Sequence, residues 1–117
     1  MRMDRIHYAG DSILTGTEIA RALLEYAQAL AVAGTSATVD IPVVDEQDGS
    51  IGRSELLVGP ASQLMSDTVE SPYDDAIDHD LVTRMNAEAE RLRRHGSDAP
   101  SAVISTEDRD AIPDFDL

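Results

Sequence analysis

The sequence predicts a small α+β domain, in which one long helix covers a mainly antiparallel sheet of four to five strands and a second helix follows. Two observations support this prediction. Apolar residues recur at the helical period between residues 17 and 33, and again between residues 78 and 95. Between them, two runs of alternating apolar and polar residues flank an Asp-Gly pair, a strong β-hairpin signal. The expected order is hairpin, helix, hairpin, an optional fifth strand and a C-terminal helix.

The composition is that of one compact domain. The chain has 117 residues, of which 42% are hydrophobic and 3% aromatic, so aliphatic side chains must build its core. We expect this domain to span residues 1–96. Residues 97–117 are polar, acidic and interrupted by proline, and we expect them to form an extended tail. Since cysteine is absent from the sequence, disulfides, thiolate zinc sites and cysteine nucleophiles are excluded.

The formal net charge of −14 restricts the possible partners. A surface this acidic repels nucleic acid and anionic membranes, so neither is expected to bind. No segment contains the roughly 18 consecutive apolar residues of a membrane span, and the N-terminal segment lacks the apolar stretch of a signal peptide. We therefore expect a cytoplasmic protein whose partner is another protein or a second copy of the same chain.

A first hairpin is predicted from two short runs, residues 5–9 and 12–15, that have strand-like composition. Gly10 and Asp11 lie between them, and glycine at the first central position suits a type II′ turn. The hairpin would lead directly into the long helix.

The long helix is predicted from about Thr17 to Ala33. Thr15 or Thr17 would cap its start, and Gly34 would end it in the left-handed conformation. Its apolar face, which should cover the sheet, consists of Ile19, Leu23, Tyr26, Ala27, Leu30 and Ala31.

A second hairpin is predicted from residues 38–44 and 51–58, with Asp48 and Gly49 as a two-residue turn. This turn would pair Val39 with Val58, Ile41 with Leu56, and Val43 with Ser54. Its apolar side would then face the helix, whereas the opposite side would meet solvent and carry Asp40, Pro42, Arg53 and Glu55.

The C-terminal part of the domain permits two interpretations before its helix. Residues 60–70 could form a short helix after Pro60 or a strand from Gln63 to Val69, and we favour the strand. The second helix should span Asp78 to His95, because its start is acidic and its end is rich in arginine. A narrow apolar stripe along it consists of Ile77, Leu81, Met85 and Leu92, and Val82 lies beside this stripe.

Residues 6–16, with the sequence IHYAGDSILTG, carry the sharpest motif. This block resembles the first block of the GDSL (SGNH) esterases, in which the serine is the nucleophile and its N–H joins the oxyanion hole. The resemblance implies that Ser12 would be the nucleophile. The family's other blocks are not matched, because the single asparagine, Asn86, lacks the family's Gly-x-Asn-Asp context and neither His79 nor His95 follows an Asp by three residues. A Gly-Asp hairpin turn explains the same residues, so the esterase is a remote alternative, and His7 is interpreted as structural or surface-exposed.

Residues 73–80, YDDAIDHD, contain candidate metal ligands. Asp75 and His79 are four residues apart and share a helix face if the helix begins early, and Asp78 lies beside them. Carboxylates and imidazole could bind Mn²⁺, Zn²⁺ or Mg²⁺ there. The alternative is an acidic first turn that the helix dipole favours. The sequence predicts no other cofactor, because it has no glycine-rich phosphate loop or dinucleotide fingerprint.

The function is not determined by the sequence. Because the residues do not include a complete catalytic set, we expect a non-enzymatic interaction or accessory domain, with self-association into a homodimer as one form. The metal- or small-ligand-binding domain is the alternative. Candidate contact residues are Pro42 at a sheet edge, Phe115 in the tail, and the helix residues Leu81, Met85 and Leu92. For each of them, packing within its own domain is the competing interpretation.

Overall fold

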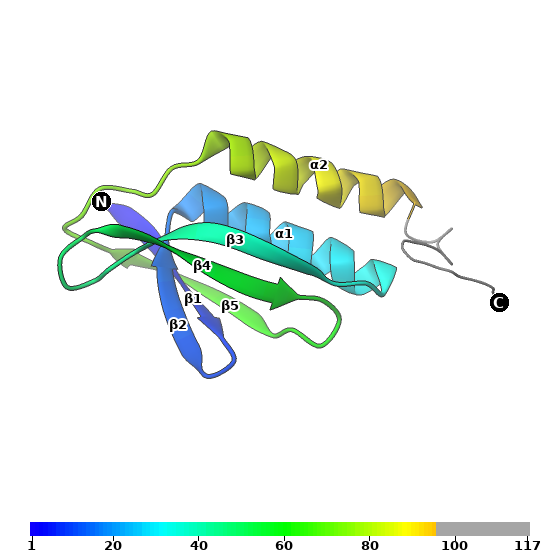
Figure 1. Cartoon of the computed structure of the whole chain (residues 1–117), viewed down its shortest axis with the longest axis horizontal. Helices are drawn as coiled ribbons and strands as arrows, with labels where there is room; N and C mark the ends of the chain where they lie inside the picture. Colours follow the sequence, from blue (N-terminus) through cyan, green and yellow to red (C-terminus); the bar gives the residue numbers. More distant parts are fainter. Residues whose placement is uncertain (96–117) are drawn as a thin grey trace.

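The computed structural model describes residues 1–95, which form two helices and five strands (Figure 1). The elements are β1 (Arg2–Tyr8), β2 (Asp11–Thr15), α1 (Thr17–Ala33), β3 (Ala37–Val44), β4 (Ile51–Val58), β5 (Leu64–Glu70) and α2 (His79–His95). Every strand pairing is antiparallel. The predicted α+β class is confirmed, and so is the strand interpretation of residues 64–70. The predicted tail, residues 97–117, lies outside the described residues.

The strands form two sheets, whereas one sheet of four to five strands was predicted. One sheet has the order β2-β1-β5 and the other pairs β3 with β4. β2 lies beside β3, and the Thr15 hydroxyl donates to the Pro42 carbonyl at 2.7 Å. The Asp45 N–H donates to the Ser50 carbonyl, so Asp45 bonds to β4. Residues that bond to the partner strand alternate along an antiparallel ladder, and Pro42 is three positions from Asp45. The nitrogen of Pro42 therefore points away from β4, toward β2. Because proline has no N–H, the ladder is interrupted where the two sheets would join.

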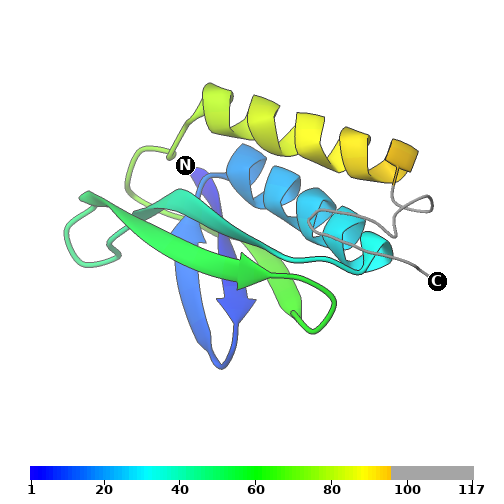
Figure 2. The ribbon, with the colours of Figure 1, turned by 45° about the vertical axis from the view of Figure 1, so that its right-hand side comes forward.

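Both helices lie on the same side of the strands (Figures 1 and 2). α1 packs against β1 and β5, and α2 packs on α1. Both sheets and both helices contribute to one aliphatic core. Its completely buried members include Met3, Ile6, Ile19, Leu23, Ile41 and Val58.

The predicted bounds of α1 are confirmed, but its start differs from the prediction. The N-cap is Gly16, and no side chain caps the helix. The Thr15 hydroxyl bonds to β3, and the Thr17 hydroxyl donates to Asp4 at 2.9 Å. Gly34 ends the helix with φ 72°, the left-handed conformation that was predicted.

The buried face of α1 is wider than its predicted apolar stripe. Ile19, Leu23 and Leu30 are buried and Tyr26 and Ala27 partly so, as predicted, but Ala31 is exposed. Three further alanines are buried as well: Ala20, Ala22 and Ala29. The extra width is consistent with α1 contacting the strands on one side and α2 on another.

The first hairpin turns one residue earlier than predicted. Tyr8 pairs with Asp11, so Ala9 and Gly10 form the turn instead of Gly10 and Asp11. Their φ angles are 53° and 82°, and two positive values identify a type I′ turn, which fits the twist of a hairpin.

The second hairpin has a four-residue loop instead of a two-residue turn, so the predicted register was wrong. Val39 pairs with Leu56 and Ile41 pairs with Ser54. The carboxylates of Asp45 and Asp48 explain the longer loop, because each accepts a backbone N–H two residues ahead. The register moves by two residues, so the predicted apolar face still points inward.

α2 begins at His79, one residue later than predicted, and Asp78 caps it. The Leu81 N–H donates to the Asp78 carboxylate at 3.0 Å. Leu81, Met85 and Ala89 are buried on the side that faces α1, whereas Ile77, which precedes the helix, is 62% exposed. Neither helix in residues 1–95 is long and apolar enough to cross a membrane.

Candidate functional site

An open cleft of about 900 Å³ lies between the tip of the β1–β2 hairpin and the connection from β4 to β5. Residues 7–12 form one wall, and Leu57 with residues 59–65 forms the other. The walls are tied together, because the Tyr8 hydroxyl donates to the Leu57 carbonyl. The connection is also braced internally, since the Gly59 N–H donates to the Ser62 hydroxyl at 3.0 Å. The cleft is therefore part of the folded domain.

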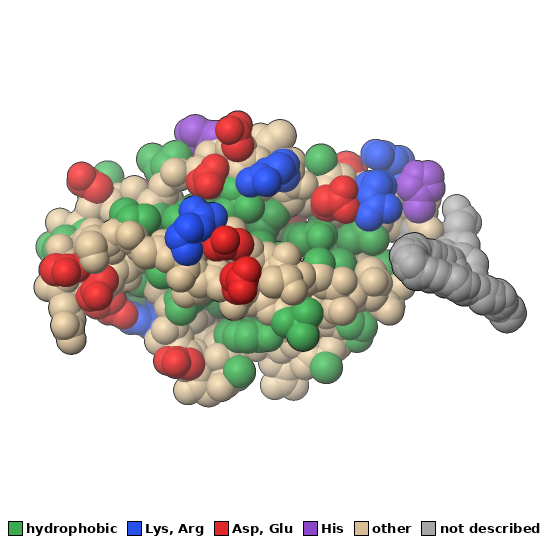
Figure 3. All heavy atoms as spheres, viewed as in Figure 1, with side chains coloured by type: hydrophobic (Ala, Val, Ile, Leu, Met, Phe, Trp, Pro, Cys, Tyr) green, Lys and Arg blue, Asp and Glu red, His purple; other side chains and the backbone are tan. Residues whose placement is uncertain are grey.

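The lining of this cleft carries little charge. Among residues 1–95, the ionisable residues that line it are Asp11, His7 and Tyr8, although the whole chain has a net charge of −14. Two large apolar side chains stand in solvent beside it, because Leu57 is 60% exposed and Met65 is 57% exposed. Figure 3 shows no acidic or basic side chain at the lower right, where β4 continues into the connection to β5. An uncharged region with exposed large apolar side chains is typical of a contact surface.

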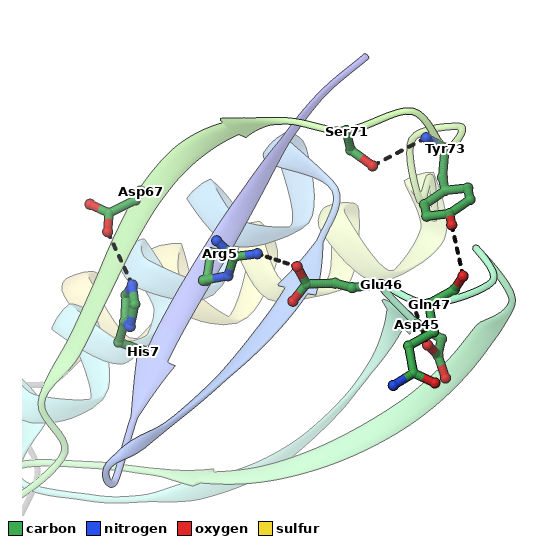
Figure 4. Close-up of polar contacts among 8 residues, drawn as sticks. All are labelled: Arg5, His7, Asp45, Glu46, Gln47, Asp67, Ser71 and Tyr73. Atoms are coloured by element: carbon green, nitrogen blue, oxygen red, sulfur yellow. Dashed lines mark hydrogen bonds and ion pairs between the residues drawn. The ribbon is translucent and has the colours of Figure 1, made fainter.

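A serine, a histidine and a carboxylate meet on one face of the three-stranded sheet. His7 Nε2 lies 3.0 Å from Asp67 Oδ2, so β5 holds the imidazole (Figure 4). Ser12 is directly opposite His7 in the β1–β2 ladder, and opposite residues share a face. The pairing of β5 with β1 brings Asp67 to His7, and no local pattern in the sequence indicates that pairing.

This group lacks two features of an acyl-transfer site. Within residues 1–95, no hydrogen bond joins the Ser12 hydroxyl to His7, and the Ser12 N–H donates instead to the Asp11 carboxylate at 2.8 Å. The N–H that would stabilise an oxyanion by the esterase resemblance is therefore occupied. The structure brings Ser12 and His7 together but leaves the nucleophile without an activating bond.

Other polar contacts on this side of the molecule hold the β3–β4 loop in place (Figure 4). Arg5 of β1 forms an ion pair with Glu46 of the loop. The Tyr73 hydroxyl donates to the Gln47 carbonyl at 3.0 Å. These contacts bind the loop to β1 and to the segment that leads into α2, so we assign them a structural role.

The three predicted metal ligands have separate roles in the structure. Asp78 caps α2, and His79 is exposed with Nδ1 3.5 Å from the Glu18 carboxylate. Asp75 faces the start of α1 instead. Residues 1–95 contain no group of three or more His, Asp or Glu side chains that could hold a metal ion. The metal-binding hypothesis gains no geometric support and stays a prediction.

Asp75 has the most unusual environment of the acidic side chains. Its Oδ1 atom is buried and has no hydrogen-bond partner within the described part of the chain. Burial raises the pKa of Asp75 above its ordinary value, although the backbone N–H of Ala76 opposes this effect, and the charge of Glu18 adds to the increase. A Cβ atom on Gly16 would lie 2.8 Å from this oxygen, so Asp75 packs closely against the start of α1.

The predicted contact residues are mostly occupied within the domain. Pro42 lies on an edge strand of the two-stranded sheet, as predicted, but its side chain is buried beside β2, so the predicted exposure to solvent was wrong. Leu81 and Met85 are buried as well, and Leu92 is partly buried against the same core. Their stripe serves the packing of α2 on α1, which was the competing interpretation. Phe115 lies outside the described residues.

No protein-family model, curated protein or solved structure matches this chain. The function therefore has to be argued from the cleft and from the surfaces that adjoin it.

Proposed function

We propose that this chain is a non-enzymatic protein-interaction domain, whose cleft between the β1–β2 hairpin and the β4–β5 connection receives apolar side chains of a partner. One observation supports this proposal most directly. Leu57 and Met65 stand in solvent at the rim of a nearly uncharged cleft, on a chain whose net charge is −14. Burying a leucine contributes about 1.5–3 kcal/mol, so covering these side chains would favour association.

The proposal is tested by selecting peptides from a display library on the full chain and measuring their affinities for two variants. Leu57→Asp places a charge in the cleft and should weaken the binding of selected peptides about tenfold or more, because the apolar contact is lost. Ile51→Asp is the matched control, since Ile51 lies on the same strand, is 58% exposed and does not line the cleft. Fluorescence anisotropy with labelled peptides gives both affinities.

Selective weakening by Leu57→Asp supports the cleft as the binding site. Equal affinities for both variants, or a selection that enriches no peptide, would overturn the proposal. Circular dichroism of each variant shows that the domain is folded during the measurement.

A second candidate function is ester hydrolysis by Ser12. It is favoured by the position of His7 opposite Ser12 and by the bond between His7 and Asp67. If this group is catalytic, the full chain should hydrolyse p-nitrophenyl acetate, and Ser12→Ala should abolish that turnover because the nucleophile is removed. Ser50→Ala, in the β3–β4 loop, is the control. Equal rates for the wild-type chain and both variants would exclude Ser12 as the nucleophile.

A further inference from the structure

We infer that the partner is an extended, positively charged peptide that adds as a further strand to the outer edge of β5. The inference rests on the proposed function, because the cleft lies at the start of this strand. Strand addition supplies affinity through backbone hydrogen bonds and specificity through pockets for alternate side chains.

The outer edge of β5 is open within residues 1–95, where β5 pairs with β1 alone. Met1 and Ser71 form a doubly bonded pair beside this ladder, since each nitrogen donates to the other residue's carbonyl. Hydrogen-bonded pairs alternate along an antiparallel ladder, so the odd-numbered residues of β5 bond to β1. The backbone groups of Ser66, Thr68 and Glu70 therefore point away from β1, toward the place of an added strand.

The open edge is continuous with the cleft. Leu64 and Met65 are the first two residues of β5, and both line the cleft. A peptide that pairs with the edge would extend past these residues, and its alternating side chains would direct one into the cleft. Edge and cleft would thus form one binding site.

Charge identifies the occupant of this edge. β5 carries Asp67 and Glu70 and no basic residue, within a chain of net charge −14. A second copy paired antiparallel through β5 would bring two such acidic strands together, which is unfavourable. The segment 96–117 of the same chain has a single arginine among several acidic residues, so it meets the same repulsion. Asp67 is bonded to His7 and Glu70 lies 3.9 Å from the N-terminal amine, so a basic peptide is attracted mainly by the field of the whole molecule.

The test uses the full chain and a labelled synthetic peptide of seven residues, the length of β5, in which lysine alternates with valine and leucine. Thr68→Pro removes one outward N–H without removing a bond to β1, and should weaken binding about tenfold. The control is Glu55→Pro, which removes an outward N–H from the edge of β4 by the same alternation. It should leave the affinity within about twofold of the wild-type value, since that edge is not the site.

Two further measurements keep the inference testable. A peptide with glutamate in place of lysine should bind about tenfold or more weakly, because it carries the same charge sign as the domain. If circular dichroism shows that Thr68→Pro is unfolded, a modified lysine peptide replaces this variant. The backbone nitrogens along one edge of this peptide are methylated, so the peptide cannot donate hydrogen bonds to β5. That peptide should lose affinity to the same extent.

Unchanged binding to Thr68→Pro, or equal binding of the glutamate peptide, would overturn the inference. So would a dimer of the full chain that Thr68→Pro dissociates in sedimentation analysis, because the occupant would then be a second copy. The proposed function fails by a different result, namely selected peptides that bind Leu57→Asp as well as they bind the wild-type chain. If Leu57→Asp weakens the binding of a peptide but Thr68→Pro does not, the cleft remains the proposed binding site and strand addition to β5 is excluded.

Discussion

At the scale of single residues, Asp75 makes stability depend on pH. Its carboxyl group has a raised pKa in the folded protein, mainly because burial disfavours the charged form. Between the ordinary value of 3.8 and the raised pKa, the folded state keeps a proton that the unfolded state has released. The folded state then binds more protons, so the free energy of unfolding falls as the pH rises through this interval. Below 3.8 both states are protonated and the contribution of Asp75 is constant.

We predict that Asp75→Asn removes this dependence. The free energy of unfolding of the wild-type chain, measured against that of Asp75→Asn, should fall as the pH rises from 3.8 through the raised pKa of Asp75. Urea titrations followed by circular dichroism at several pH values measure this difference. Asp74→Asn, which changes the exposed neighbouring carboxyl, is the control. A difference that increases with pH would contradict the assignment of a raised pKa to Asp75.

At the scale of elements, α1 holds the domain together because it contacts β1, β5 and α2. Leu23 is completely buried at the centre of this helix, whereas Val32 is 83% exposed near its end. The same change to aspartate should therefore be severe at Leu23 and nearly neutral at Val32.

Leu23→Asp is predicted to abolish cooperative folding, because it leaves an unpaired charge in the core. Val32→Asp should change the free energy of unfolding by only about 0.5 kcal/mol, since the side chain already stands in solvent. Urea unfolding monitored by far-ultraviolet circular dichroism compares them. A cooperative transition in Leu23→Asp would mean that the buried face of α1 is assigned incorrectly.

The elements themselves could be predicted from local patterns, but their pairing could not. The apolar periodicity of α1 located both ends of the helix, and the alternation in β3 and β4 located both strands. Both hairpins differ in register from the expectation by two residues. In the second hairpin the Asp45 carboxylate accounts for the longer loop. In the first, Ala9 adopts a positive φ of 53°, which alanine disfavours, so the residues did not indicate this turn. A register shift of two residues leaves each side chain on the same face of the sheet, so the inward-facing residues of the β3–β4 hairpin were still predicted correctly.

At the scale of the whole molecule, the candidate site depends on contacts between distant segments. Ser12 was noticed because its motif is local, whereas the bond between His7 and Asp67 joins residues that are 60 positions apart. Leu57 alternates with the inward-facing Leu56 and Val58, so its exposure follows from the pattern, but the cleft that it shares with Met65 was not predicted, because it depends on how β4 and β5 are placed. Pro42 shows the converse case, because its missing N–H was recognised but the strand that covers it was not.

The pairing of β1 with β5 also has a consequence for folding during translation. β1 and its neighbour β2 are translated before the other elements, whereas β5, the second neighbour of β1, follows after α1, β3 and β4. α2 is translated after β5. Until α2 is made, α1 lacks the contacts that α2 provides in the folded domain. The core formed by residues 1–95 is therefore complete only when α2 has left the exit tunnel. A truncation before β5 would release a chain in which β1 pairs only with β2 and exposes its other edge, which is a substrate for chaperones and proteases.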